Sequence, residues 1–244
     1  MIHNTNGIVL RSIKYGETSV IVNIFTELFG IQSYLVNGVR SSKQSGSKSI
    51  YFQPGSLLEM QVYNRDMKNL QRIKEYKWSY LYANVFTDVV KNAVAMYMVE
   101  LLQRSLKQPE ENPRLFAFVE DAFMKLDRAP NAVTANYPLY FAVQLAQFLG
   151  FGILDRYSVI NNVLDMQEGR FAAEIPAHSF FLEGELAFAS SQLLKALHPD
   201  DLMGIKLNKH ARRHLLLAYQ SFYALHIQDF GVMKTLPIVQ EILE

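Results

Sequence analysis

Apolar and polar residues alternate through the first third of the chain. Leu58, Met60 and Val62 alternate with Glu59, Gln61 and Tyr63, and the run from Ser19 to Thr26 is rich in β-branched side chains. This period of two predicts half-buried strands, and glycines between the runs supply turns. Five short strands in so short a stretch are typical of a small barrel or sandwich. The expected strands are residues 7–12, 19–26, 31–39, 57–62 and 70–76.

The apolar spacing changes to three and four residues in the middle of the chain, which predicts helices. One long helix is expected over residues 78–102. Asn112 followed by Pro113 predicts the start of a second helix. An Asn side chain caps the free N–H groups at a helix start, and Pro is well tolerated in the first helical turn. A third helix is expected over residues 138–149, with Gly150 as its terminator.

The periodicity weakens after Phe151. Residues 157–189 predict irregular structure with one hairpin. Helix is expected to return as a short segment over 191–197 and as a long one that Asn208 caps and that ends near Gly231. We therefore expect an α+β chain with a barrel domain at 1–78, a helical domain at 79–150, and an insert (151–189) plus C-terminal helices packing on the helical domain at 151–244.

None of the 244 residues is cysteine. This excludes disulfides, cysteine-bound zinc, iron–sulfur clusters and thiol nucleophiles, and it fits a reducing compartment. The most apolar stretch, residues 140–154, is interrupted by Gln and Gly and is shorter than the ~18–20 residues of a spanning helix. The first residues lack the pattern of a secretory signal. We therefore expect a cytoplasmic protein without a membrane span.

The net charge of +1 conceals an asymmetry. Up to Tyr80 there are ten Lys and Arg against five Asp and Glu, and the remainder has 14 against 18. The strand-rich part thus carries +5 and the rest −4. A basic first part suggests an anionic partner. The alternative is that these charges only solvate the surface.

No motif in the chain demands an enzyme. Gly46-Ser47-Lys48-Ser49 is similar to the end of a phosphate-binding loop, but Gly46 is followed by serine and the next segment is strand-like. Residues 41–49 are instead expected to form a basic loop that either reaches phosphates or is simply solvated. Adjacent carboxylate pairs fit helix ends or solubility. We expect neither catalytic residues nor a cofactor.

His210 and His214 have a metal-ligand spacing on an expected helix. Two arginines lie between them where a metalloprotease has a glutamate, and positive charge opposes a metal, so no metal is expected. We interpret the segment as a secondary basic patch for phosphates or an acidic partner, with a solvated face as the alternative. Its cationic residues are Lys206, Lys209, Arg212 and Arg213.

Aromatic residues interleave with the basic residues of the first part. Ring faces stack on unpaired bases at about 1–3 kcal/mol per base, while Lys and Arg follow the phosphates. A small barrel also needs large side chains in its core. Tyr15, Tyr34 and Tyr63 are therefore candidates for exposed stackers, with burial as the alternative for each.

Several short motifs follow one another in the first forty residues. They are Gly7-Ile8-Val9-Leu10-Arg11, Tyr15-Gly16-Glu17-Thr18-Ser19, Phe25-Thr26, Gly30 and Gly38-Val39-Arg40, followed by residues 52–55, 57–62 and 70–75. A helical middle, an insert and a final helix that ends in residues 235–239 come after this block. In these motifs and this order of modules, the chain resembles the RecO family of DNA repair and recombination mediators.

The resemblance implies an OB-fold nucleic-acid-binding domain at 1–78. It implies a protein, not an enzyme, that binds single- and double-stranded DNA and anneals complementary strands. With RecR, it would help RecA to load onto DNA covered by single-strand-binding protein. The residues expected at DNA phosphates, taken from the charges of the matching barrel, are Arg11, Lys14, Arg40, Lys43, Lys48, Lys68 and Arg72. The alternative is an adaptor whose OB fold binds only protein.

Many RecO family members carry a four-cysteine zinc site in the insert that follows the helical middle. Residues 151–189 contain no cysteine, so the resemblance is to a branch without this metal. Apolar side chains are expected to take over its structural role. They are Ile153, Leu154, Val163, Leu164, Phe171, Phe180 and Phe181.

Overall fold

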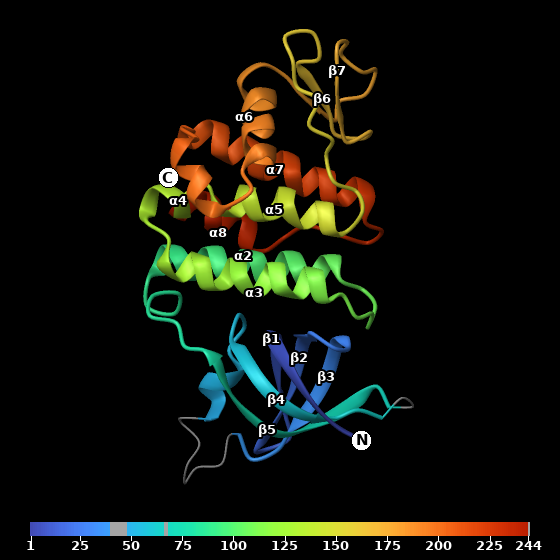
Figure 1. Ribbon diagram of the computed structural model, residues 1–244, viewed down its shortest axis with the longest axis vertical. Helices are drawn as coiled ribbons and strands as arrows, with labels where there is room; N and C mark the ends of the chain where they lie inside the picture. The colour runs from blue at the N-terminus through green and yellow to red at the C-terminus, as the bar shows by residue number, and fades with distance from the viewer. Residues whose placement is uncertain (40–47, 66–67, 244) are drawn as a thin grey trace. The chain divides into compact units, whose positions relative to one another are not determined.

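A computed structural model describes residues 1–39, 48–65 and 68–243 of the chain (Figure 1). The chain divides into two compact units. The barrel unit consists of Met1–Ala83 and Leu106–Met124, and the helical unit consists of Asn84–Ser105 and Lys125–Glu244. The domain limits at residues 78 and 150 stay predictions.

Five strands close into a barrel in the order β1-β2-β3-β5-β4 (Figure 1). Paired strands are antiparallel except β3 and β5, which are parallel. A closed five-stranded barrel followed by helices is the predicted fold class, which is thereby confirmed. The strands are β1 Ile2–Tyr15, β2 Ser19–Thr26, β3 Gly30–Val36, β4 Leu57–Tyr63 and β5 Leu70–Tyr80.

Alternate residues of the strands fill the barrel. On β2, Val20 and Val22 are at most 5% exposed, whereas Ile21 between them is half-buried on the outer side. This is the alternation that a pleated strand imposes. The short helix η1, Ser49–Phe52, adds Phe52 to the same core. Because the interior is packed with side chains, a ligand of the barrel must bind its outer side or its loops.

The helix predicted over residues 78–102 is wrong at its start. Trp78 lies within β5, and α2 begins only at Val89. Trp78 pairs with Leu58 of β4, and its ring stacks on Tyr51 with 4.5 Å between the ring centroids. The spacing of aromatic residues in this segment also fits a helix. Contacts with residues distant in sequence keep the segment in the sheet.

Two helices begin at the caps that the sequence predicts. Asn112 Oδ1 accepts a hydrogen bond from Leu115 N–H at 3.0 Å, and Asn208 Oδ1 accepts one from Ala211 N–H at 2.8 Å, which confirms both caps. In the part of the chain that the structure describes, no helix is long and apolar enough to cross a membrane. The helices are α2 Val89–Ser105, α3 Pro113–Arg128, α4 Asn131–Thr134, α5 Tyr137–Phe148, α6 Gly184–Lys195, η2 Pro199–Gly204, α7 Lys209–His226 and α8 Thr235–Ile242.

Two predicted helix limits in the last part are wrong. α6 begins at Gly184, earlier than expected, and no side chain caps it. Its first turns are held instead by packing, with Ala187 completely buried. α7 ends at His226, because Ile227 already has an extended backbone and Gly231 lies in the following loop.

The insert forms a small three-stranded sheet in the order β7-β6-β8 rather than a single hairpin. Leu164 and Phe171 are buried in it as expected. Leu154 and Phe180, however, are 56% and 42% exposed and contribute little to its core. Very short strands carry too few residues to show a period, which is why the sequence predicted irregular structure. The strands are β6 Val163–Asp165, β7 Arg170–Ala172 and β8 Phe181–Leu182.

Asp165 organises the turn between β6 and β7. Its Oδ1 accepts hydrogen bonds from the N–H groups of Gln167 and Glu168, both at 2.9 Å. The same oxygen lies 3.3 Å from His178 Nε2. One carboxylate therefore joins the turn to the segment that leads into β8.

Replacing Asp165 with alanine should loosen this small sheet, because removing the buried acceptor of two partly buried hydrogen bonds costs about 1 kcal/mol or more. We expect faster hydrogen exchange at the amides of residues 163–172 and no change in α2. Glu174→Ala, at an exposed position of the same insert, is the matched control and should exchange like the unmodified protein. Equal exchange in both variants would contradict this role of Asp165.

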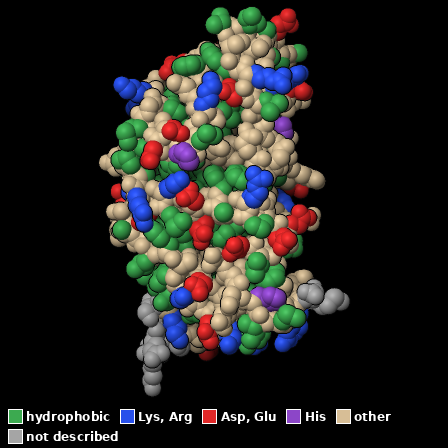
Figure 2. Space-filling model, in the orientation of Figure 1, with side chains coloured by type: hydrophobic (Ala, Val, Ile, Leu, Met, Phe, Trp, Pro, Cys, Tyr) green, Lys and Arg blue, Asp and Glu red, His purple; other side chains and the backbone are tan. Residues whose placement is uncertain are grey.

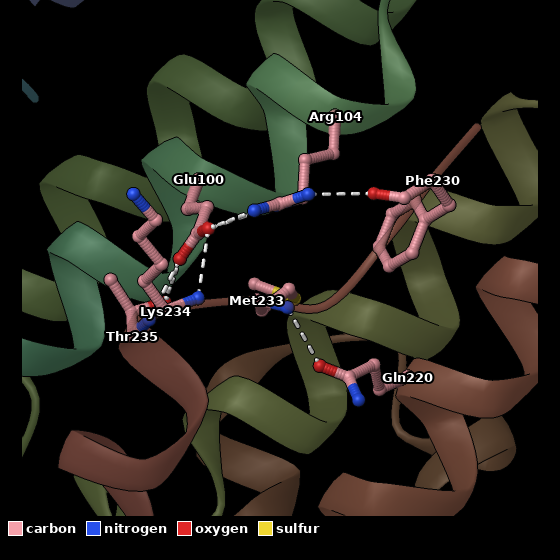
Figure 3. A network of polar contacts seen from close by, with 7 residues as sticks. All are labelled: Glu100, Arg104, Gln220, Phe230, Met233, Lys234 and Thr235. Carbon is pink, nitrogen blue, oxygen red and sulfur yellow. Dashed lines mark hydrogen bonds and ion pairs between the residues drawn. The ribbon is translucent and has the colours of Figure 1, made fainter.

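A polar network connects α2 to the segment that leads into α8 (Figure 3). The Glu100 carboxylate accepts hydrogen bonds from Lys234 N–H at 2.9 Å, from Thr235 N–H at 2.8 Å and from Thr235 Oγ1 at 2.7 Å. It also forms an ion pair with Arg104 at 2.8 Å, and Arg104 Nη1 donates to the Phe230 carbonyl at 2.7 Å. A residue of α2 thus satisfies the first N–H groups of α8, where a negative charge is favourable.

Candidate nucleic-acid interface

Two rows of side chains cross the outer side of strands β1, β2, β3 and β5. Directly paired residues of adjacent strands point to the same side of a sheet, so the strand register defines these rows. Each row has four residues, and we call these eight residues together the outer face. The first row is Arg11, Asn23, Ser33 and Leu70, and the second is Ile13, Ile21, Leu35 and Arg72.

Arg11 and Arg72 are the cations of the outer face, and both are exposed. Among the described residues, no carboxylate forms an ion pair with either of them. On this side of the barrel, β2 and β3 lie between β1 and β5, the strands that carry the two residues. Between them, Ser33 Oγ donates a hydrogen bond to Asn23 Oδ1 at 3.1 Å. The face can therefore meet phosphates at two points with neutral surface between them.

Lys14 does not belong to the outer face. It lies opposite Val20, which faces the barrel core and is 5% exposed. Lys14 itself stays exposed because β1 continues beyond its pairing with β4, which ends at Ile8. The structure thus separates Lys14 from Arg11, although charge alone placed them in one group.

The other cations predicted in the first part are distributed differently. Lys48 is exposed and directly precedes η1. Arg40 and Lys43 lie outside the described residues. Lys68 and Arg72 come together at the β4–β5 loop.

The three candidate tyrosines have different environments. Tyr15 is 52% exposed at the end of β1, and Tyr63 is half-buried opposite Arg72. Tyr34 is 1% exposed, and burial raises the pKa of its hydroxyl. Tyr34 is therefore a core residue, which leaves Tyr15 and Tyr63 as candidates for stacking on bases.

The β4–β5 loop presents a basic groove. Arg65, Lys68 and Arg72 line it together with Tyr63. Buried Gln71 holds the backbones of Arg65 and Lys68, because its Nε2 donates to their carbonyls at 2.9 and 2.7 Å, and its Oε1 accepts from Arg65 N–H at 3.1 Å. Arg65 was missed from the sequence, although its place just after a strand was a usable signal. The loops beside an OB barrel are a usual site for oligonucleotides.

The secondary basic patch, in the helical unit, is only partly exposed. Lys206, Lys209 and Arg213 are exposed. Arg212 instead donates to Asn136 Oδ1 at 3.2 Å and to the carbonyls of Leu243 and Leu207 at 3.0 and 3.2 Å. Burial lowers the pKa of its guanidinium group. Arg212 therefore connects parts of the helical unit.

Charges of both signs are interspersed on the face shown in Figure 2. In the described ranges, no three His, Asp or Glu side chains gather where they could hold a metal ion. His210 and His214 are both exposed. Within the described part of the barrel unit, Arg65, Lys68 and Arg72 lie together at one groove.

Comparison with known proteins covers nearly the whole chain. Residues 1–82 match the family described as Recombination protein O N terminal, and residues 87–235 match Recombination protein O C terminal. The chain is 34% identical over 242 residues to the DNA repair protein RecO of Phocaeicola vulgatus, with 99% of each chain covered. It is 33% identical over 246 residues to that of Bacteroides fragilis, with both chains covered completely, and 31% identical over 242 residues to that of Flavobacterium psychrophilum, with 98% of each covered. The chain therefore belongs to the RecO family of DNA repair proteins.

Proposed function

We propose that this protein is a DNA-binding recombination mediator of the cytoplasm. It binds single- and double-stranded DNA, anneals complementary strands and, together with RecR, helps RecA to load onto single strands covered by single-strand-binding protein. Membership of the RecO family and the names of its relatives support a role in DNA repair. The proposed function needs no covalent chemistry and no cofactor.

The observation that carries this proposal is the placement of unpaired cations on the barrel. Arg11 and Arg72 stand on the outer face, and Arg65 and Lys68, whose backbones bond to Gln71, line a groove together with Arg72. Cations on a rigid sheet can follow a phosphate backbone without selecting a sequence. Sequence-independent binding is what an annealing protein requires, because it must accept any strand and reduce the repulsion between two of them.

We propose phosphate contacts for Arg11, Lys68 and Arg72 first, and for Lys14 and Lys48 on the remaining surface of the barrel unit. Lys206, Lys209 and Arg213 would provide a second contact in the helical unit. Arg40 and Lys43 belong to the same proposal on charge alone. Arg212 is left out, since its guanidinium group already bonds to Asn136 and to two carbonyls.

The direct test is the binding of a labelled single-stranded oligonucleotide, measured by anisotropy across a salt series. Each phosphate that is neutralised on a single strand contributes about −0.7 to the slope of log K against log salt. The double variant Arg11→Gln/Arg72→Gln should therefore flatten the slope by about 1.4 and weaken binding to all sequences alike. It should also slow the pairing of a complementary strand.

Lys77→Gln is the matched control for this test. Lys77 is exposed on the outer side of β5 like Arg72, but it forms an ion pair with Glu59 at 2.9 Å. Removing it should leave the slope unchanged. Absence of binding at low salt would contradict the proposal and favour a protein-binding adaptor, whereas equal slopes in both variants would contradict the assignment of Arg11 and Arg72.

A further inference from the structure

A second hollow of the barrel unit lies where three segments meet. They are the β2–β3 turn with the start of β3, the β4–β5 loop, and the linker between α2 and α3 at residues 107–111. We call this hollow the linker pocket. Its volume of about 500 Å³ lies within the range of roughly 300–1,000 Å³ that small-molecule sites occupy.

The linker is a fixed wall of this pocket. Gly30 has a left-handed backbone with φ of 60°, and a Cβ atom there would collide with the backbone of Glu110. The linker backbone therefore lies directly against the β2–β3 turn. Behind it, the ring of Phe116 packs on Phe25 with 5.5 Å between the ring centroids. All of these residues belong to the barrel unit, so the pocket lies within one compact unit.

The second wall consists of residues 64, 65, 68 and 69, between β4 and β5. Gln71, which is 4% exposed, bonds to the backbone of Arg65 and Lys68 and thereby sets the positions from which both side chains extend. A site on a loop is precise only when other contacts hold that loop. Gln71 is therefore a positioning residue for the pocket.

The lining combines three kinds of groups. Arg65, Lys68 and Lys107 are cations, and no described carboxylate pairs with them, although Glu111 also lines the pocket. The side-chain amides of Asn69 and Gln108 make no hydrogen bond to any other described residue.

Apolar surface completes the lining. Phe29 and Ile31 contribute it, and Phe29 is held in place by an edge-on contact with His3 at 5.2 Å between the ring centroids. A nucleotide has the matching parts, namely a flat ring, polar ring edges and a phosphate. Amides are suited to base edges because each offers both donors and an acceptor.

We propose that the linker pocket takes one unpaired nucleotide of a DNA strand bound to the outer face. The base lies against Phe29 and Ile31 with its edge toward Asn69 and Gln108, and its phosphate meets Lys68 and Lys107. This inference rests on the proposed DNA binding and refines it. A base in a duplex is stacked and paired, so filling the pocket requires a single strand. The pocket therefore gives the protein a preference for single strands.

The test uses the full chain and three labelled ligands of equal length, namely a single strand, a strand of abasic nucleotides and a duplex. Asn69→Ala/Gln108→Ala should weaken binding of the normal single strand about five- to tenfold, because two hydrogen bonds are lost. It should leave binding of the abasic strand and of the duplex unchanged. Lys107→Gln should flatten the salt slope for single strands by about 0.7.

The outcomes separate the two proposals. If the amide variant binds all three ligands as the unmodified protein does, the pocket is overturned and DNA binding by the outer face stands. If it loses affinity equally for the normal and the abasic strand, the site holds phosphate only and the base-binding role is overturned. If no ligand binds at low salt even to the unmodified protein, the proposed function fails and the pocket fails with it.

Discussion

Replacing Glu100 with alanine is expected to lower the free energy of unfolding by about 3 kcal/mol. The Glu100 side chain is 14% exposed, and it accepts hydrogen bonds from Lys234, Thr235 and Arg104 (Figure 3). Alanine leaves these donors without their acceptor and leaves the Arg104 charge without its partner. For a chain of this size, the change corresponds to a fall in Tm of roughly 6–12 °C. Thermal unfolding followed by circular dichroism of the helices measures it.

Glu241→Ala is the matched control for Glu100→Ala. Glu241 lies on α8 itself but is exposed, and an exposed substitution changes stability by about 0.5 kcal/mol or less. If the network holds α8 in place, Glu100→Ala should also make the loop between α7 and α8 more sensitive to a protease, and Glu241→Ala should not. Equal stability of the two variants would contradict the role of Glu100.

The effect of Glu100 should depend on pH in a defined direction. Burial raises the pKa of its carboxyl group, but the hydrogen bonds from Lys234, Thr235 and Arg104 outweigh this and bring the pKa below its ordinary value of 4.5. A carboxyl whose pKa is lowered by folding stabilises the protein fully above its unfolded pKa, and this stabilisation is lost as the pH falls through the folded pKa. The difference between the unmodified protein and Glu100→Ala should therefore shrink below pH 4.5.

Local signals predicted the barrel and the starts of α3 and α7 correctly. Alternation on β2 and the caps at Asn112 and Asn208 are properties of a few adjacent residues, so they are visible in the sequence. The end of β5 was missed because it depends on the stacking of Trp78 on Tyr51, which are 27 positions apart in the sequence. Tertiary contacts of this kind override a local period.

The candidate interface was predictable by residue type but not by placement. Charge identified Arg11 and Lys14 together, yet the strand register directs them to opposite sides of β1. Lys107 was missed because it lies in a linker that only the close contact between Gly30 and Glu110 brings to the barrel. Which cations share a surface is decided by register and by long-range packing, and neither is encoded in a short window of sequence.

Phe52→Ala is expected to destabilise the barrel unit by about 3–5 kcal/mol. The Phe52 ring is 2% exposed inside the barrel core and contacts Tyr76 edge-on at 4.8 Å between the ring centroids. Alanine would leave a cavity that the closed sheet cannot collapse to fill, so the cost includes both lost burial and the cavity itself. No neighbouring strand can move inward without breaking its pairing on both sides.

The only tryptophan of the chain makes this loss directly measurable. Trp78 lies on β5 and stacks on Tyr51 of the same short helix η1 as Phe52, so denaturant unfolding followed by tryptophan fluorescence reports on this end of the barrel. Ile50→Ala, at a 45% exposed position of η1, is the control and should shift the midpoint far less. A similar shift for both variants would mean that η1 stabilises the barrel through its backbone and not through the Phe52 ring. A large shift for Phe52→Ala alone, accompanied by weaker DNA binding, would show that the packed interior is what keeps Arg11 and Arg72 at their spacing on the outer face.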